Sequence, residues 1–266
     1  MGDCSKLTKD ESKLAVNLEG VSKSFGAIRA VKNLDLQIYA GTVFGFLGPN
    51  GSGKSTTMKM IMGLLKADSG NLNVYGIDVS NNPWDVKKIV GYVPESPRLY
   101  DFLTGLEYLD FIADVYGLDA ATKKTRIDEY LDAFDLENRE NEMISGYSHG
   151  MQQKIALIAA LLHKPKLLIM DEPLSGLDPK SARIAKDLIH KLATEGVTTI
   201  LSTHVLEIAD AVCDKIAILY QGSKLAEGTP AQLRKESKMP NSTLEEIFLK
   251  LTGTNDIKDI VQALGK

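Results

Sequence analysis

The sequence lacks an apolar run long enough to cross a membrane, and it has little cysteine. Its apolar stretch "IALIAALL" ends at His163 and Lys164, short of the roughly 18 apolar residues that a spanning helix needs. The opening "MGDCSKLTKD" has no signal-peptide core, and Lys6 stands where a myristoylation motif has Ser or Thr. Cys4 and Cys213 lack metal-site spacing, which favours a reducing compartment and unlinked thiols. We therefore expect a cytoplasmic protein without leader or lipid anchor.

An excess of charge of one sign is also absent. The chain has 31 Lys and Arg against 35 Asp and Glu, a formal net charge of -4. This balance argues against a nucleic-acid binder held by a broad basic surface, so we expect no nucleic acid among the partners. Hydrophobic residues make up 44% and charged residues 25%, as in ordinary globular proteins. The length of 266 residues allows one large domain or two modest ones.

Strand-like and helix-like segments alternate along the chain, which predicts an α/β fold. Continuous apolar runs typical of central parallel strands cover residues 42–47, 166–170 and 197–203. A helix from residue 181 to about 193 connects the last two runs. The more alternating "LAVNLEGVSKSF" and "LDLQIY" predict an antiparallel β piece near the start, and "KIAILYQGSKLAEG" predicts a hairpin.

The middle and the end of the chain differ from this pattern. Residues 104–134 carry apolar side chains at helical spacing without strand signals, which predicts a helical subdomain inserted over residues 94–154. The stretch "TPAQLRKESKMPNS" is typical of a linker, and "STLEEIFLKLTG" of an amphipathic helix. We therefore expect a C-terminal helical extension over residues 236–266.

The stretch "GPNGSGKST" matches the phosphate-loop pattern of Gly, four residues, Gly, Lys, then Ser or Thr. Its glycines allow backbone N–H groups to approach phosphate oxygens, and the following helix adds its dipole. Lys54 would hold the outer phosphates, Ser55 would offer a hydroxyl to Mg²⁺, and Thr56 would help hold the phosphates. A flexible glycine turn is the alternative, although a strand precedes the loop and a helix follows it. The expected nucleotide-binding residues of this loop are Gly48, Pro49, Asn50, Gly51, Ser52, Gly53, Lys54, Ser55 and Thr56.

An acidic pair and a histidine also stand at the ends of predicted strands. In "LLIMDEP", Asp171 ends a buried strand and is placed to hold a Mg²⁺-bound water, while Glu172 is placed to polarise an attacking water. The alternative is that both only begin a turn before Pro173. His204 lies just beyond the next strand, where it would sense a γ-phosphate or play a structural role.

Taken in order, these motifs resemble the ATP-binding cassette (ABC) ATPases. The likeness covers nearly the whole chain, and it implies a single nucleotide-binding domain over residues 1–266. The phosphate loop, a helical insert, "YSHGMQQK", "LLIMDEP", "SGLD" and "STH" follow one another as in that family. The resemblance implies a P-loop NTPase core of RecA-like, mainly parallel sheet, with an antiparallel β subdomain and an inserted helical subdomain. It also implies ATP and Mg²⁺ as ligands.

In that family two cassettes bind ATP head to tail, and the signature of one closes over the phosphates held by the other. The resemblance therefore places Ser148 and the Gly150 amide on the γ-phosphate bound by a second cassette, which is either another copy or a relative. Asp178 of "SGLD" would couple the two sites. Phe25 matches the position that stacks on adenine, with a core Phe as the alternative. The signature residues are Ser148, His149, Gly150 and Gln152.

Two residues depart from the family pattern. His149 stands where the signature usually has a second glycine, and Glu95 stands where Gln usually contacts Mg²⁺ and water. A carboxylate at residue 95 can still bind Mg²⁺ but cannot donate a hydrogen bond as an amide can. With the roles given to Glu172 and His204, we expect three catalytic residues: Glu172, His204 and Glu95. The expected Mg²⁺ ligands are Ser55, Asp171 and Glu95.

The resemblance is strongest to exporter-type cassettes that pair with separate permeases. It implies an ATPase subunit held on the inner face of the cell membrane by a permease, whose helix we expect near residues 95–106. Apolar contact there would come from Tyr100, Phe102, Leu103 and Leu106, unless these only pack the helical subdomain. A soluble cassette ATPase acting on ribosomes or DNA is the alternative. A kinase using the same loop would leave the signature, "SGLD" and His204 unexplained.

Overall fold

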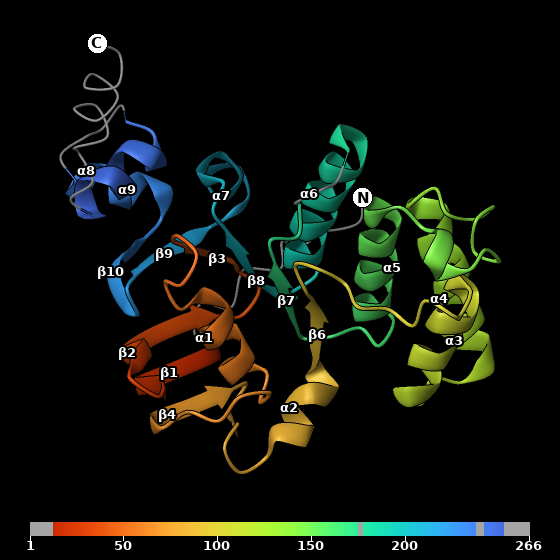
Figure 1. Cartoon of the computed structure of the whole chain (residues 1–266), viewed down its shortest axis with the longest axis horizontal. Coiled ribbons are helices and arrows are strands. Elements are labelled where there is room, and N and C mark those ends of the chain that lie inside the picture. The colour runs from red at the N-terminus through yellow and green to blue at the C-terminus, as the bar shows by residue number, and fades with distance from the viewer. Residues whose placement is uncertain (1–12, 175–177, 238–241, 253–266) are drawn as a thin grey trace, which may run out of the picture.

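A six-stranded sheet, ordered β10-β9-β3-β8-β7-β6, forms the centre of the molecule (Figure 1). The computed structural model describes residues 13–174, 178–237 and 242–252. Neighbouring strands of this sheet are parallel, except that β10 pairs antiparallel with β9. The strands are β3 (Val43–Leu47), β6 (Val90–Val93), β7 (Leu167–Asp171), β8 (Thr198–Thr203), β9 (Lys215–Tyr220) and β10 (Ser223–Gly228). The predicted parallel core and the predicted hairpin are confirmed.

A second sheet, ordered β2-β1-β4-β5, is antiparallel throughout. Its long first hairpin turns between Phe25 and Ile28, where Gly26 adopts the left-handed conformation with φ 57°. Its strands are β1 (Leu14–Phe25), β2 (Ile28–Tyr39), β4 (Ser69–Val74) and β5 (Ile77–Asp78). The antiparallel piece predicted near the start of the chain is therefore present.

Side chains on opposite faces of the central sheet build two separate cores. Phe44 and Phe46 of β3 pack with the antiparallel sheet and α1 (Lys54–Ile61), while Val43 and Leu47 pack with the helices on the other face. This division follows from the two-residue alternation of a β-strand. Because both faces are covered, the central strands are buried and read as continuous apolar runs.

Several of the remaining helices begin at local capping signals. Thr104 and Glu107 form a capping box at the start of α3, and Asp178 caps α6 with Pro179 following it. α1 ends at Ile61, because Gly63 takes φ 65° shortly afterwards. The helices are α2 (Pro83–Ile89), α3 (Gly105–Val115), α4 (Ala120–Ala133), α5 (His149–Leu161), α6 (Pro179–Thr194), α7 (Leu206–Val212), α8 (Pro230–Glu236) and α9 (Leu244–Thr252), with a 3₁₀ turn at Ile144–Gly146. Within the described ranges, no helix combines the length and apolar character needed to cross a membrane.

The helices α3, α4 and α5 lie together at one side of the molecule, away from the antiparallel sheet (Figure 1). They correspond to the predicted helical insert. α5 runs to Leu161, so the expected boundary at residue 154 falls inside this helix. The buried second half of α5 packs against β6, and it therefore joins the insert to the central sheet.

The expectation of a linker before the last helix is wrong, because residues 230–236 form α8. Thr229 and Gln232 make a capping box, Pro230 occupies the first turn, and Leu233 is buried. Cys213 is a buried free cysteine, and burial raises the pKa of its thiol to about 12. Cys4 lies outside the described residues.

Replacing Phe44 by alanine should destabilise the fold strongly. Phe44 is fully buried and packs edge-on to Phe46, with ring centroids 5.5 Å apart. Truncating such a ring leaves a cavity and costs about 3–5 kcal/mol. Denaturant unfolding of Phe44→Ala measures this cost. Phe111→Ala, at a ring that is 44% exposed, is the matched control and should change the free energy of unfolding little; equal losses in the two variants would contradict the two-core packing.

Candidate nucleotide site

The predicted phosphate loop and the polar groups after β6, β7 and β8 meet at one edge of the central sheet. Leu47 pairs with Thr203, Asp171 with Ser202, and Val93 with Met170. The last residues of four neighbouring parallel strands are thus in register. The segments that follow them start from a common edge, the place where α/β sheets bind ligands.

Glycines let the loop follow a path that side chains would block. Gly48 has φ 153°, and a Cβ there would lie 2.2 Å from the Leu219 carbonyl oxygen. Gly53 has φ 106°, and its Cβ would lie 2.5 Å from the Ala30 carbonyl oxygen. The loop is therefore wrapped tightly against β2 and β9, and these two positions tolerate no other residue without backbone movement.

The loop closes around its own lysine. Lys54 is 6% exposed, and its Nζ donates to the carbonyl oxygens of Gly48 at 2.6 Å and Pro49 at 3.2 Å. The first-turn N–H groups of α1 have no carbonyl within the helix to accept them. The buried Ser52 hydroxyl has no hydrogen-bond partner among the described residues. A cluster of donors with spare capacity at a helix start is suited to an anion such as a phosphate.

Burial and nearby carboxylates act in opposite directions on the pKa of Lys54. Burial lowers the pKa of the Lys54 ammonium below its ordinary value. Three carboxylates act in the opposite direction, in decreasing order those of Glu172, Asp171 and Glu95. The structure therefore brings Glu95, which is exposed after β6, within electrostatic range of the loop. Burial likewise raises the pKa of Tyr92 to about 12, and the Asp171 and Glu95 carboxylates add to that shift.

Asp171 and Glu172 are held by a serine that sequence reasoning missed. The Ser202 hydroxyl donates to Asp171 Oδ1, and the Glu172 amide donates to Ser202 O and Oγ, both at 3.2 Å. Ser202 is buried in β8, and the polar residue inside the apolar run "VTTILST" was the available signal. Glu172 has φ 49°, a conformation that a non-glycine residue keeps only when its surroundings enforce it.

Glu172 faces His204 across the edge of the sheet. Glu172 is 6% exposed, and its Oε1 lies 2.9 Å from His204 Nδ1. The imidazole is 59% exposed, so it contacts the buried carboxylate on one side and the open edge on the other. An imidazole N–H in this position can orient the carboxylate, which is otherwise free to accept a proton.

The signature residues lie apart from this edge. Ser148 caps α5, its Oγ accepting from the Met151 amide at 3.3 Å, and both Ser148 and His149 are exposed. Gly150 and Gln152 in the first turn are half-buried. Figure 1 shows α5 and α1 on different sides of β6 and β7. The structure therefore does not bring the signature to the loop of its own chain.

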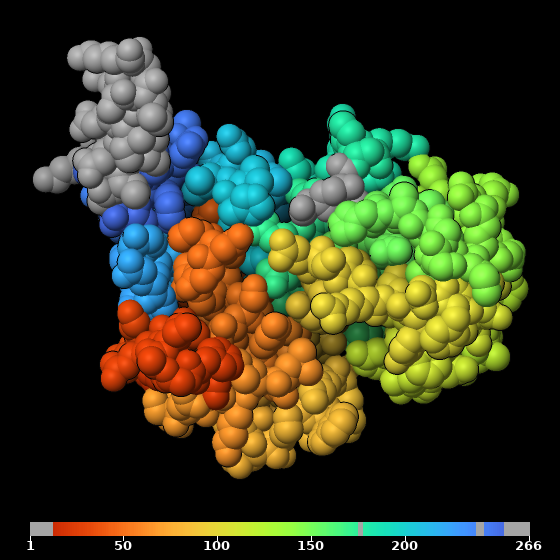
Figure 2. All heavy atoms as spheres, viewed as in Figure 1, coloured from red at the N-terminus to blue at the C-terminus, as the bar shows by residue number. Residues whose placement is uncertain are grey.

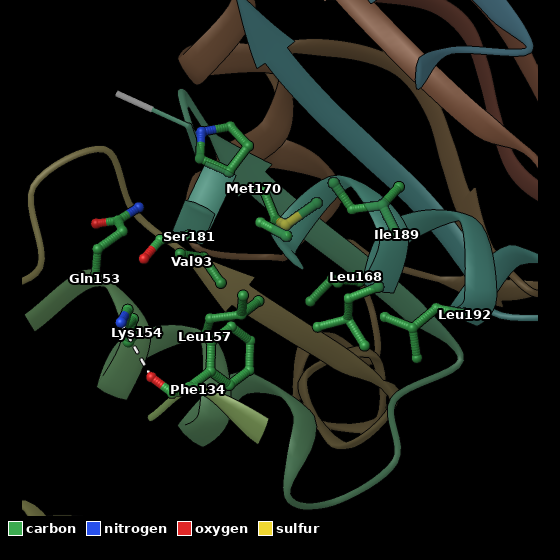
Figure 3. A pocket seen from close by; sticks show the side chains of 13 residues that line it. Val93, Phe134, Gln153, Lys154, Leu157, Leu168, Met170, Ser181, Ile189 and Leu192 are labelled. Atoms are coloured by element: carbon green, nitrogen blue, oxygen red, sulfur yellow. Dashed lines mark hydrogen bonds between the residues drawn. The ribbon is translucent and has the colours of Figure 1, made fainter. Parts of the chain in front are cut away.

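An enclosed cavity beside the signature helix is not the nucleotide site. It lies between α5, α6, β6 and β7 and has about 10 Å³ of space, room for a single water (Figure 3). Most of its walls are apolar, such as Leu157 and Met170. Gln153 also lines it, and the amide of this residue is buried without a hydrogen-bond partner among the described residues. This space is too small for a nucleotide.

The two remaining predicted residues are on the surface. Asp178 is exposed and accepts from the Ser181 amide at 3.0 Å as the cap of α6; residues 175–177 of "SGLD" lie outside the described part. Phe25 is 50% exposed, with Lys23 Nζ 5.6 Å from its ring centroid. This exposure sets aside the alternative of a core Phe and leaves one ring face available for stacking.

The acidic groups do not form a metal site by themselves. Among the described residues, no group of three or more His, Cys, Asp and Glu side chains could hold a metal ion. Ser55, Asp171 and Glu95 nevertheless offer oxygen atoms, the donors that Mg²⁺ prefers. Mg²⁺ in phosphate sites is commonly held by one or two carboxylates together with phosphate oxygens. The donor set thus fits a Mg²⁺ ion that arrives with a phosphate ligand.

Comparison with known proteins agrees with this geometry. The ABC transporter family model matches residues 31–175. The chain is 39% identical to the linearmycin resistance ATP-binding protein LnrL of Bacillus subtilis, over 90% of this chain and 75% of the relative. It is 36% identical to the daunorubicin/doxorubicin resistance ATP-binding protein DrrA of Streptomyces peucetius, over 83% of this chain and 67% of the relative.

Solved structures give the same result. An ATP-binding subunit of an ABC transporter superposes with a TM-score of 0.85 at 32% identity, covering 90% of this chain and 99% of the other. A cassette solved as a dimer in a post-hydrolysis state, bound to ADP and Pi, superposes with a TM-score of 0.74 at 28% identity, covering 80% of this chain and 98% of the other. The chain therefore belongs to the ABC transporter family, and it is an ATPase of that family.

Proposed function

We propose that this chain is the ATP-hydrolysing subunit of a membrane exporter, in which two cassettes close head to tail around two ATP molecules and drive a separate permease. The observation that carries the proposal is that Ser148 begins α5, which packs on the opposite face of the central sheet from α1, the helix that begins with Lys54. The relatives LnrL and DrrA are resistance ATP-binding proteins, and a further relative, 37% identical, is the Nod factor export ATP-binding protein I of a Rhizobium species. The cassette would then lie on the inner face of the cell membrane.

The loop residues from Gly48 to Thr56 bind the phosphates in this proposal, and the exposed ring of Phe25 stacks on the adenine. Lys54 holds the outer phosphates because its ammonium is already positioned by the loop carbonyls. Ser55, Asp171 and Glu95 would hold Mg²⁺. When bound, Mg²⁺ would neutralise charge on the phosphates.

Glu172 serves as the general base. A water aligned with the γ-phosphate gives its proton to the Glu172 carboxylate while its oxygen attacks phosphorus and the bond to the ADP oxygen breaks. His204 Nδ1, 2.9 Å from Glu172 Oε1, orients the carboxylate. The left-handed backbone of Glu172 and its bonds to Ser202 fix the side chain at the edge of the sheet.

A second cassette completes the site. Its Ser148 and Gly150 would contact the γ-phosphate, with the N-terminus of its α5 adding a favourable dipole. His149 and Gln152 belong to the same segment, and exposed His149 has room to point away from the nucleotide. Asp178, exposed at the start of α6, would lie at the seam between the two copies and couple the two sites.

A groove between α2, α3 and α5 is suited to a permease helix. It has about 350 Å³ of space, and Leu99, Tyr108 and Ala156 are among its apolar walls. Figure 2 shows the surface hollowed where the orange-yellow α2 region meets the yellow-green helices. Tyr100, 49% exposed, contacts the Tyr108 ring of the groove wall, and Phe102, 67% exposed, contacts Tyr100. Leu103 and Leu106 are half-buried. An apolar groove with exposed aromatic residues at its margin is a common way to bind an amphipathic helix.

Tagged protein recovered from detergent-solubilised membranes of its native cell should bring down a stoichiometric polytopic membrane protein. Phe102→Asp should reduce that recovery at least tenfold, because a buried unpaired carboxylate opposes apolar docking. Ile28→Asp is the matched control, since Ile28 is 70% exposed on β2, and it should not reduce recovery. Mass spectrometry identifies the partner. Recovery of only ribosomal or DNA-bound proteins from the soluble fraction would overturn the exporter and leave the ATPase standing.

Glu172→Gln should retain ATP binding but slow hydrolysis by roughly 10²-fold or more, because the amide cannot accept the proton. With Mg·ATP the variant should accumulate as a dimer in sedimentation velocity. Lys54→Ala is the comparison variant and should lose most ATP binding in a titration. Hydrolysis at the parent rate would show that Glu172 is not the base.

Ser148→Arg should block hydrolysis while leaving ATP binding by the monomer unchanged, because the added cation intrudes on a site formed between two copies. Ser145→Arg, at another exposed serine shortly before it, is the matched control and should hydrolyse ATP normally. Mixing Ser148→Arg with Lys54→Ala protein should restore hydrolysis, since a mixed dimer pairs one intact loop with one intact signature. A mixture no more active than its two components would contradict head-to-tail sites.

A further inference from the structure

The C-terminal helix reaches the nucleotide edge. A depression of about 230 Å³, called the loop cup here, is lined by Leu47, Gly48, Pro49, His204, Leu206 and Phe248. Gly48 and Pro49 begin the phosphate loop, and His204 faces Glu172. Phe248 belongs to α9, far along the chain from the loop. The C-terminal helix thus supplies an aromatic ring to the border of the nucleotide site.

Several contacts hold α9 in this position. Leu244 and Ile247 are buried on its inner side. Arg234 of α8 bonds to Asp210 of α7, and its Nε donates to the Ser242 carbonyl oxygen at 3.0 Å just before α9. Lys250 Nζ donates to the Ser237 carbonyl oxygen at 2.6 Å. α7 itself begins at Leu206, directly after the His204 segment. α9, which carries Phe248, is therefore tied to α7, the helix that follows the histidine segment.

Phe248 is only half-buried in the single chain. Its inner part packs against the core, and it lines the loop cup together with half-buried Leu206 and exposed Pro49. Apolar atoms at the border of a catalytic edge are more stable when another surface covers them. The position of the cup indicates which surface that is.

The proposed dimer brings a second copy to this place. For the second copy's signature to contact a phosphate at Lys54, its surface must approach the loop, and Lys54 Nζ is bonded to the carbonyl oxygens of Gly48 and Pro49. These two residues also line the loop cup. A surface that contacts Gly48 and Pro49 also lies over the adjoining loop cup, which Phe248 lines.

We propose that Phe248 is a contact residue of the ATP-bound dimer, and that the second copy of this chain covers the loop cup. The inference rests on the proposed head-to-tail dimer and extends it, because the interface then includes α9 in addition to the loop and the signature. Aromatic residues, Phe among them, are enriched in the buried parts of protein interfaces. The C-terminal unit of α8 and α9 would thereby favour ATP-driven closure.

The test measures dimerisation of Glu172→Gln protein in Mg·ATP by sedimentation velocity over a range of concentrations. Adding Phe248→Ala should raise the dimer dissociation constant at least tenfold. Adding Phe111→Ala is the matched control, because that ring is 44% exposed on α3, and it should change the constant less than twofold. ATP affinity of the monomer should stay within twofold of the parent in both variants.

A second measurement does not require removal of the ring. The chain has one tryptophan, Trp84, so Trp84→Phe combined with Phe248→Trp and Glu172→Gln places the single indole in the loop cup. Acrylamide quenching of its fluorescence should fall at least twofold when Mg·ATP drives dimerisation. The same protein carrying Ser148→Arg should show no such fall. This readout holds even if Phe248→Ala loosens α9.

The outcomes separate this inference from the function on which it rests. If the Glu172→Gln parent stays monomeric in Mg·ATP, the dimer itself is wrong and the inference falls with it. If the parent dimerises but Phe248→Ala and Phe111→Ala give the same constant, with quenching unchanged, only the inference is overturned. A drop in monomer ATP affinity for Phe248→Ala alone would assign the ring to its own nucleotide site and also overturn the proposal.

Discussion

The parallel register of β3, β8, β7 and β6 is the constraint on which the rest of the site depends. Because paired strands end level with one another, a loop, a carboxylate pair and a histidine from distant parts of the sequence reach one edge. The burial of both sheet faces keeps this register, since a shift by one residue would exchange the two cores. The positions of the groups at this edge therefore depend on the packing of the two cores.

The same constraint leaves the site incomplete in a single chain. α5 begins at the Ser148 cap and packs against β6 on one face of the central sheet, whereas α1 packs on the other face. The helix start is formed and exposed, yet it has no phosphate of its own chain to meet. In the proposed head-to-tail dimer, this helix start of one copy meets the phosphate loop of the other.

Burial and nearby charges act in opposite directions on the ionisable groups at this edge of the sheet. Burial works against the ammonium of Lys54, and nearby carboxylates work in its favour. Glu172 is buried in a left-handed backbone conformation and is held through Ser202 and His204. Such features cost stability, and the surrounding strands enforce them. A γ-phosphate entering here would meet hydrogen-bond donors and the Glu172 carboxylate already in place.

The sequence by itself determined the class of fold, the phosphate loop, the Asp-Glu pair and the order of the motifs, because these depend on local patterns: apolar runs, glycine spacing and strand ends. The capping box of α8, at Thr229 and Gln232, is also visible in the sequence, although the composition of this stretch is typical of a linker. Only the tertiary structure decided that Ser202 bonds to Asp171 and Glu172, that α5 and α1 lie on opposite faces of the central sheet, and that Phe248 borders the loop. Those contacts join residues far apart in the chain, and no local periodicity encodes which distant side chains meet when the strands pair.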